Sequence, residues 1–192
     1  YLFLFVLFGA MAERLGTGRF FIEFASAVAG RTTGGPAKVA SLSSALFGSI
    51  SGSAVANIMT TGSFTIPLMK RLGYRPAFAG SVEAVSSTGG QIMPPVMGAA
   101  AFVMAEIMGV AYINIMLIAL IPATLFFVSV FLAIHFEAKR QGLSGLSEEE
   151  TPRVGTVLRE RGHQILPRFV IVAAMFNGYS PAYAAFWGIL SI

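Results

Sequence analysis

The chain has 192 residues, of which 55% are hydrophobic and 11% are charged, and its net charge is +4. The absence of cysteine excludes a disulfide scaffold, a thiol nucleophile and a cysteine-based metal site. Long runs with almost no charge, such as 113–134 and 169–192, are each long enough to cross a bilayer as a helix. The sequence therefore predicts an all-α polytopic membrane protein, surrounded by a lipid bilayer and with no nucleic-acid partner.

Residues 1–35 are predicted to contain the end of a spanning helix followed by a shorter helix that lies at the membrane surface. The apolar part of the second helix, 20–29, is too short to span, and charged residues lie among its aromatic residues. No basic region typical of a signal peptide precedes the first apolar run. Because the chain begins and ends within apolar runs, we expect it to be a piece of a longer protein.

Residues 36–69 are predicted to form two helical arms, about 36–48 and 54–69, on either side of the stretch FGSISGSAVAN. If this segment crossed the membrane once, Lys38 would lie on the opposite side from Lys70. Lys and Arg normally collect on the cytoplasmic side, and all 13 of them fall on one side if the segment enters and returns. The charge pattern therefore predicts a re-entrant helical hairpin that opens to the cytoplasm.

The rest of the chain is predicted to contain one broken span and two complete spans. Residues 70–110 form a broken transmembrane helix, because SSTGGQIMPP places two glycines and two prolines within one apolar run. A complete span follows over 111–136. A cytoplasmic linker, 137–165, contains a short amphipathic helix over 152–161, and the last span, 166–192, begins the next repeat or domain.

Two breaks at similar depth favour a binding site over ordinary helix packing. Irregular backbone within a bilayer is stable only where it is buried in protein or lines a water-filled cavity. The hairpin tip offers free carbonyl oxygens, which attract a small hard cation such as Na⁺, and helix N-terminal N–H groups, which attract an anion. The alternative is close helix packing through the GxxxG pair Gly48 and Gly52.

Glu83 is the ionisable side chain that lies well inside a predicted span, so it is a candidate supporting or proton-sensitive residue. It lies about two turns from the cytoplasmic end of its helix, and the alternative is that it extends to that surface or pairs with Lys70 or Arg75. No Lys or Arg is predicted within a span. An anionic substrate would therefore be held by helix ends, hydroxyls and amides.

An intramembrane hydrolase is the least supported class of function. A serine nucleophile needs a base within hydrogen-bonding reach, and both His135 and His163 are predicted near the cytoplasmic boundary, far from the hairpin serines. The stretch GSISG also lacks the GxSxG spacing of a nucleophile elbow. We therefore predict that the protein is not an enzyme, with no catalytic residue and no transition-metal site.

The stretch SALFGSISGSAVANIMTTGSFTIPLMKRLGYRPAFAGSVEAVSSTGGQIMPPVMGAAAFVMAE closely resembles the large membrane subunit of tripartite ATP-independent periplasmic (TRAP) transporters. The motifs STGGQIMPPVMGAAAF and NGYSPAYAAFWGIL are similar to those of fused permeases that work with TAXI-type binding proteins. The resemblance covers nearly the whole chain. It implies an elevator-type secondary transporter with two inverted repeats, each containing a hairpin and a broken helix. This chain would hold one repeat and would not transport alone.

The resemblance also implies a function and its partners. The family imports small organic acids (carboxylates) on a Na⁺ gradient, with no cofactor other than this coupling ion. A periplasmic binding protein, here of the TAXI type, would deliver the substrate, and a small membrane subunit or its fused equivalent would complete the permease. The protein would lie in a bacterial or archaeal inner membrane, with its Lys- and Arg-rich loops in the cytoplasm.

Carried onto this sequence, the resemblance implies two sets of site residues. The Na⁺ ligands would come from the hairpin tip and the broken helix, namely Ser49, Ser51, Gly52, Ser53, Ser87, Thr88, Gly89 and Gly90. The substrate would contact the same tip and the helix end beyond it, namely Ser53, Asn57, Gln91, Pro94 and Pro95. The alternative coupling ion is H⁺.

Two alternatives to a TRAP permease stay open at this point. One is another elevator-type symporter of an anion with a cation, and the other is a membrane scaffold or channel subunit that does not transport. Cation-dependent binding would separate a transporter from a scaffold. Saturable uptake that depends on a binding protein would separate a transporter from a channel.

Overall fold

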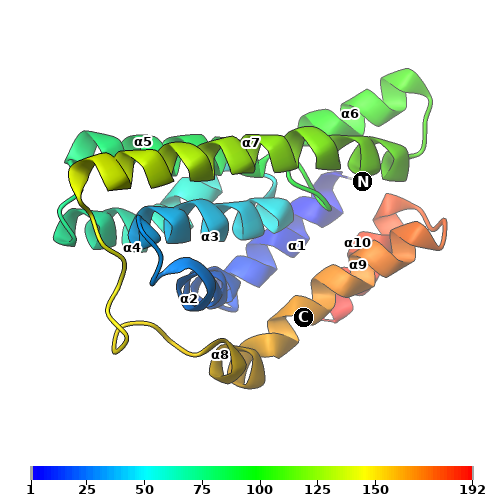
Figure 1. The fold of residues 1–192 in the computed structure, drawn as a ribbon. Helices are drawn as coiled ribbons and strands as arrows, with labels where there is room; N and C mark the ends of the chain where they lie inside the picture. Colours follow the sequence, from blue (N-terminus) through cyan, green and yellow to red (C-terminus); the bar gives the residue numbers. More distant parts are fainter. Residues whose placement is uncertain (1, 192) are drawn as a thin grey trace.

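The computed structural model describes residues 2–191, and these form helices without any β-strand (Figure 1). In chain order the elements are α1 Leu2–Arg14, α2 Thr17–Ala29, α3 Gly35–Ser51, α4 Ala54–Arg71, α5 Pro76–Gly90, α6 Ala99–Met108, α7 Tyr112–Gln141, α8 Val154–Arg161, a 3₁₀ turn Gly162–Ile165, α9 Leu166–Phe176 and α10 Pro181–Leu190. The all-helical prediction is confirmed over these residues. Tyr1, the first residue of the first predicted segment, and Ile192, the last residue of the last one, lie outside the described residues.

The predicted hairpin arms are present as α3 and α4, which pack against each other and are joined by only Gly52 and Ser53. Gly52 ends α3 in the left-handed conformation at φ 60°, which favours glycine. The Ser53 side chain then caps α4 by accepting a hydrogen bond from the backbone N–H of Ala56 at 3.3 Å. The start of α3 and the end of α4 therefore lie at the same end of the molecule (Figure 1).

Helix α5 packs along both arms, so α3, α4 and α5 form one three-helix block. Helix α2 packs mainly on α3, and α7 packs on both α3 and α5 (Figure 1). The predicted break in residues 70–110 is present, but it begins later than expected. Helix α5 continues through Ser86–Gly90, and the irregular backbone covers 91–98, between α5 and α6. Two consecutive prolines, Pro94 and Pro95, stand within it and cannot donate helical hydrogen bonds.

Helix α7 is the described helix that is long and apolar enough to cross a membrane by itself. Helices α6 and α10 are apolar but shorter. Within residues 2–191 the other predicted crossings are thus made of shorter or broken helices. Entry of the hairpin into a bilayer stays a prediction.

The predicted last span over 166–192 differs from the structure, which has two helices, α9 and α10, packed against each other. Gly178 adopts φ 78°, which reverses the chain direction. The Ser180 side chain then accepts a hydrogen bond from the N–H of Tyr183 at 3.3 Å and caps α10, which begins at Pro181. The turn residues in NGYSP thus divide an apolar run that is long enough for one span.

Residues 142–153, which we call the strap, connect α7 to α8 and cross the open end of the hairpin. Leu146 is buried, and its N–H donates to the carbonyl of Gly30 between α2 and α3 at 2.8 Å. Two ion pairs join the strap to the bases of both arms, Arg31 with Glu148 at 3.1 Å and Arg71 with Glu150 at 2.9 Å. Helix α8 follows at the predicted position.

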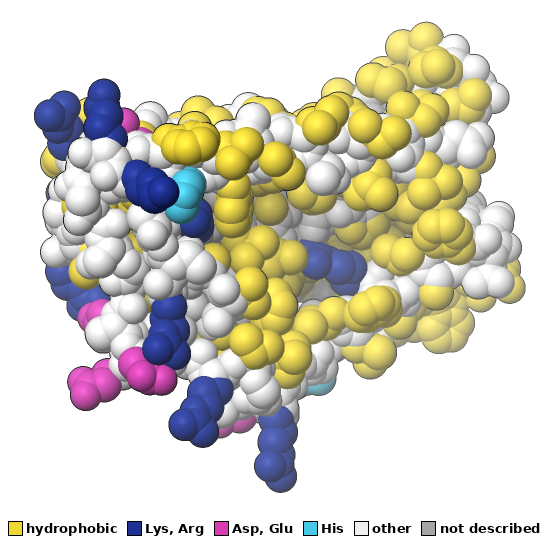
Figure 2. All heavy atoms as spheres, in the orientation of Figure 1, with side chains coloured by type: hydrophobic (Ala, Val, Ile, Leu, Met, Phe, Trp, Pro, Cys, Tyr) yellow, Lys and Arg dark blue, Asp and Glu magenta, His cyan; other side chains and the backbone are white. Residues whose placement is uncertain are grey.

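The surface charges follow this arrangement. Figure 2 shows Lys and Arg side chains gathered at the end of the molecule where α3 begins and α4 ends, and again around α8. The opposite end, around α6 and the turn between α9 and α10, is mostly hydrophobic (Figure 2). Exposed apolar side chains of this size and number are typical of surfaces that face lipid or another protein segment.

Candidate functional site

The hairpin tip and the break between α5 and α6 meet directly. The carbonyl of Ser49 accepts a hydrogen bond from the N–H of Val96 at 3.1 Å. Gly52 lies so close to the break that a Cβ at this position would be 2.0 Å from the carbonyl oxygen of Met97. Only glycine fits both this contact and the positive φ. The two irregular segments, 52–53 and 91–98, therefore form one structural unit although they are far apart along the chain.

A cavity of about 180 Å³ lies where these segments meet. Its polar lining comes from the tip, where the N–H of Ser53 contacts the hydroxyl oxygen of Ser51 at 3.5 Å. The rest of the lining is contributed by α1, the break and α6, namely Phe5, Val6, Val96, Met97, Ala99 and Phe102. The N-terminal ends of α4 and α6 both reach this cavity, through Ser53 and Ala99, and helix N-termini favour negative charge.

The predicted Na⁺ ligands do not all lie at this cavity. Ser51, Gly52 and Ser53 line it, and Ser49 is buried next to it, with its hydroxyl donating to the carbonyl of Leu46 at 2.8 Å. The predicted ligands from α5 point elsewhere. The hydroxyl of Ser87 donates to Glu83, the exposed Thr88 donates to the carbonyl of Ala84, Gly89 faces the ring of Phe126, and Gly90 packs on Gly48.

The predicted substrate residues are also divided. Ser53 lines the tip cavity, whereas Asn57 is fully buried between α3 and α4, with its amide donating to the carbonyl of Ser44 at 2.8 Å. Gln91 is exposed and lines a larger apolar cavity of about 590 Å³ on the side of α6 and α7. Pro94 is partly buried and Pro95 buried within the break.

Glu83 is the centre of a buried polar cluster that the sequence did not reveal as a whole. Its side chain is 0% exposed and accepts hydrogen bonds from hydroxyls of all three helices of the block. The donors are Ser44 on α3 at 3.1 Å, Thr61 and Thr65 on α4, the latter at 2.5 Å, and Ser87 on α5 at 3.1 Å. Asn57 completes the cluster through Thr61 and Ser44.

The alternative in which Glu83 pairs with Lys70 or Arg75 is wrong for the described residues, because neither cation forms an ion pair with it. Glu83 does not extend to the surface either, since it is fully buried. The signal for its partners was present in the spacing of Asn57, Thr61 and Thr65, which places three polar side chains on one face of α4.

Arg168 is a basic side chain that lies beside the hairpin, which the sequence analysis did not predict. Its guanidinium, on α9, donates to the carbonyl of Leu46 and to the hydroxyl of Ser49, both at 2.5 Å. It also stands 5.0 Å from the ring centre of Phe21 on α2. The sequence placed Arg168 at the cytoplasmic end of a span, but α9 packs so that its first turn lies beside the last turns of α3.

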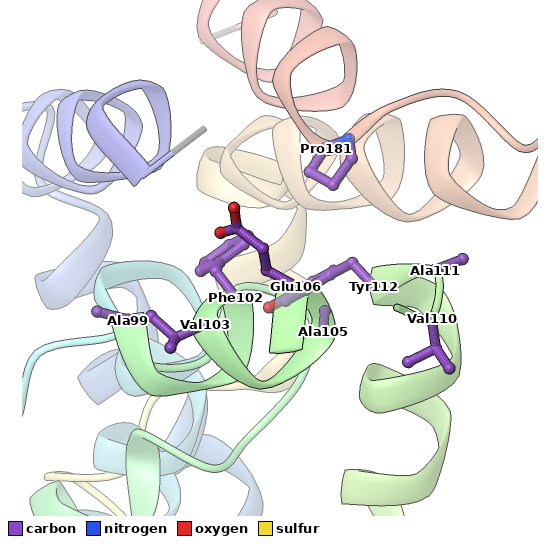
Figure 3. Close-up of a pocket in the computed structure, with 9 residues that line it drawn as sticks. All are labelled: Ala99, Phe102, Val103, Ala105, Glu106, Val110, Ala111, Tyr112 and Pro181. Atoms are coloured by element: carbon purple, nitrogen blue, oxygen red, sulfur yellow. The ribbon is translucent and has the colours of Figure 1, made fainter. Parts of the chain in front are cut away.

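A further cavity of about 560 Å³ lies between α6, the start of α7 and Pro181 of α10 (Figure 3). The carboxylate of Glu106 points toward Pro181 in this cavity (Figure 3). On its other side, Tyr112 contacts the break, because its hydroxyl donates to the carbonyls of Val96 and of Pro95, the second at 3.1 Å. Tyr112 thus fixes the irregular backbone from the α7 side.

Within residues 2–191 no group of three or more His, Cys, Asp or Glu side chains is placed to hold a metal ion. The oxygen atoms that are available to a cation at the tip are therefore hydroxyls and backbone carbonyls. Such neutral oxygen ligands suit a hard cation of low charge better than a transition metal.

The family model described as the DctM component of tripartite ATP-independent periplasmic transporters matches residues 1–192. The chain is 27% identical over 182 residues to the C4-dicarboxylate TRAP transporter large permease protein DctM of Pseudomonas aeruginosa. The aligned region covers 94% of this chain and 42% of that protein. It is 27% identical over 183 residues to the sialic acid TRAP transporter large permease protein SiaM of Vibrio cholerae, with the same coverage. An uncharacterized protein, y4mL of Sinorhizobium fredii, is 29% identical over 183 residues, and the chain covers 43% of it. The chain thus spans less than half the length of these relatives.

Proposed function

Since this chain belongs to the DctM family of TRAP transporter permeases, we propose that it supplies the hairpin and broken helix of one repeat in an elevator-type permease that imports carboxylates with Na⁺. Its relatives are named for C4-dicarboxylates and for sialic acid, and both kinds of substrate carry a carboxylate. Because the chain spans less than half of these relatives, transport is assigned to the whole permease.

The partners follow from the family. A periplasmic binding protein, which we propose to be of the TAXI type, would deliver the carboxylate, and a small membrane subunit or a fused equivalent would complete the permease in the inner membrane. The mostly hydrophobic surface around α6, α9 and α10 supports contact with lipid or with the rest of the permease (Figure 2). Loops rich in Lys and Arg would face the cytoplasm.

The single observation that carries this proposal is the meeting of the hairpin tip with the break. Two helix N-termini, those of α4 and α6, converge on one cavity through Ser53 and Ala99, and they would attract the substrate carboxylate. The hydroxyl oxygens of Ser51 and Ser53 lie at the same cavity and would act as ligands of Na⁺. Binding of the substrate carboxylate and of Na⁺ in one cavity would then be coupled, because the two opposite charges attract each other.

The block of α3, α4 and α5 would move as one body. A Cβ at Gly48 would lie 2.4 Å from the Cα of Gly90, so the backbones of α3 and α5 are in direct contact. Such close contacts between small residues are typical of helix pairs that stay together within a membrane.

The proposal is tested with the full-length permease in proteoliposomes, together with its binding protein. Uptake of radiolabelled succinate and of sialic acid is measured under an imposed Na⁺ or K⁺ gradient. We expect Na⁺-driven uptake of at least one substrate, and a severalfold higher half-saturating Na⁺ concentration for Ser51→Ala. The matched control is Ser81→Ala on the exposed side of α5, which should leave the Na⁺ response unchanged.

Two results would reject separate parts of the proposal. Uptake that does not depend on Na⁺ or on Ser51 would remove the Na⁺ site from the tip. No uptake of either acid in the presence of the binding protein would reject these carboxylates as substrates.

A further inference from the structure

Arg168 places a positive charge beside the last turns of the first hairpin arm. Its guanidinium, on α9, donates two hydrogen bonds into α3, one to the carbonyl of Leu46 and one to the hydroxyl of Ser49. It also lies 5.0 Å from the ring centre of Phe21 on α2, and the face of an aromatic ring attracts a cation. The guanidinium is therefore held in place by two helices, α3 and α2.

The hydrogen bonds that Arg168 makes do not require a charged side chain. The C-terminus of α3 is already closed by Gly52, whose N–H donates to the carbonyl of Gly48 at 2.9 Å. Leu46 lies inside α3, where the helix itself uses the backbone carbonyls. A neutral amide side chain would donate similar bonds without bringing a charge into a partly buried place. The charge of Arg168 thus needs a further explanation.

No acidic side chain compensates Arg168 in the part of the chain that the structure describes. None of the ion pairs within residues 2–191 includes Arg168. Its Nε atom is buried and has no hydrogen-bond partner among these residues. A cation that is removed from water without a counter-charge costs free energy. An anion bound nearby would lower this cost, so the site around Arg168 favours a negative ligand.

Ser49 connects Arg168 to the tip cavity. The Ser49 hydroxyl accepts a hydrogen bond from Arg168, and the Ser49 carbonyl accepts one from the N–H of Val96, which lines that cavity. Ser49 also precedes Ser51, another lining residue, by two residues, or about 3 Å of helix rise. The guanidinium therefore lies close behind the wall of the cavity.

The tip cavity has no charged side chain among the described residues that line it. The carboxylate of Glu83 also bonds to α3, but it does so at Ser44, further from the tip. Along α3, the positive charge of Arg168 is thus nearer to the cavity than the negative charge of Glu83. Charges act more strongly on one another in a partly buried site than in water. The field of Arg168 should therefore favour an anion in the cavity.

We propose that Arg168 is a specificity-determining residue, whose positive charge selects an anionic substrate, a carboxylate, at the tip cavity. The guanidinium holds α3 through its hydrogen bonds, and its charge acts from behind Ser49 without contact with the substrate. The helix N-termini at the cavity attract a carboxylate in the same way. This inference rests on the proposed function and adds a full positive charge to the partial charges of the helix ends.

The selection of charge is tested with the purified full-length permease in detergent, without its binding protein. The thermal midpoint is measured at constant Na⁺ and ionic strength with increasing succinate or its uncharged analogue succinamide, and with sialic acid or its methyl ester. A ligand that binds the folded protein raises the midpoint. We expect at least one acid to reach its half-maximal effect at a severalfold lower concentration than its uncharged analogue. Arg168→Gln should reduce this ratio severalfold, and Arg168→Lys, which keeps the charge, should retain most of it.

The ratio of acid to uncharged analogue separates a charge effect from a general loss of structure. A purely structural defect would weaken the binding of both ligands and leave their ratio unchanged. Glutamine can still donate a hydrogen bond to Ser49 or Leu46, so Arg168→Gln removes mainly the charge. The matched control is Arg159→Gln on α8, because Arg159 is exposed and forms no ion pair within the described residues. This variant should keep the ratio of the wild type.

Three results would overturn the proposal. The first is a wild type that is stabilised no more by the acids than by their uncharged analogues; a lowered midpoint of Arg168→Gln without ligand would then assign Arg168 to a structural role. The second is an unchanged ratio in Arg168→Gln, and the third is an equal loss of the ratio in Arg168→Lys. Failure of Na⁺-driven uptake, with selective stabilisation by an acid intact, would reject the proposed transport function alone.

Discussion

Replacing Gly48 by alanine tests the contact between the first hairpin arm and α5. The new Cβ would lie 2.4 Å from the Cα of Gly90 and 2.8 Å from its carbonyl carbon. Non-bonded carbon atoms prefer a separation of about 3.5–4.0 Å, and both neighbours are backbone atoms that no change of rotamer can move. Helices α3 and α5 must therefore move apart by about 1 Å.

The expected cost is that of an overpacked core, about 1–3 kcal/mol. The same movement would lengthen the bond from Ser44 on α3 to Glu83 on α5, now 3.1 Å, beyond hydrogen-bonding range. Alanine recovers part of this, since it is favoured over glycine within a helix by about 0.5–1 kcal/mol. We expect Gly48→Ala to lower the thermal midpoint of the full-length permease in detergent, measured by the fluorescence of intrinsic tryptophan.

Gly80→Ala is the matched control, because Gly80 lies in α5 and a Cβ there would meet no atom within 4 Å. This variant should be stabilised by about 0.5–1 kcal/mol. If Gly48→Ala were stabilised to the same extent, the direct contact between α3 and α5 would be refuted.

Two tyrosines provide further tests. Tyr112→Phe removes the hydroxyl that donates to the carbonyls of Pro95 and Val96. The variant should lose about 1–3 kcal/mol of folding stability, and backbone hydrogen exchange in 91–98 should increase. Unchanged exchange would contradict the role of this hydroxyl in fixing the break. Burial raises the pKa of Tyr74 from 10.0 to about 12, because it disfavours the charged phenolate. The stability that the neutral Tyr74 side chain contributes is therefore present below pH 10 and is lost as the pH rises through about 12. Tyr74→Phe should remove this alkaline loss, measured as thermal midpoint against pH, and an identical pH profile in both proteins would contradict it.

The sequence was sufficient for features that are set by neighbouring residues. Gly52 and Ser53 end one helix and begin the next through backbone conformation and capping, so the two hairpin arms were predictable. The prolines at 94 and 95 marked the break for a similar local reason. The division of the last apolar run at Gly178 was readable in principle from NGYSP, but the length and hydropathy of the run favoured one span.

The site was less predictable because it depends on which face each helix turns toward its neighbour. Ser87 and Thr88 are adjacent in sequence, yet Ser87 faces Glu83 while Thr88 is exposed. The contact of Gly90 with Gly48 fixes this rotation of α5, and no local pattern reports a contact between residues so far apart. Arg168 was missed for the same reason, since its partners on α3 are more than a hundred residues away.

The strap and Arg168 have a mechanical consequence when they are considered together. The two ion pairs of the strap are exposed, and such pairs contribute about 0–1 kcal/mol each and weaken in salt. Burial of Leu146 contributes about 1.5–3 kcal/mol, so the attachment at the base of the hairpin withstands high ionic strength. One continuous segment, 142–168, thus holds the hairpin at its base through Leu146 and near its tip through Arg168. Any displacement of the tip relative to the base must therefore strain α8 or break the bonds of Arg168, which makes this segment a tether between the two ends of the hairpin.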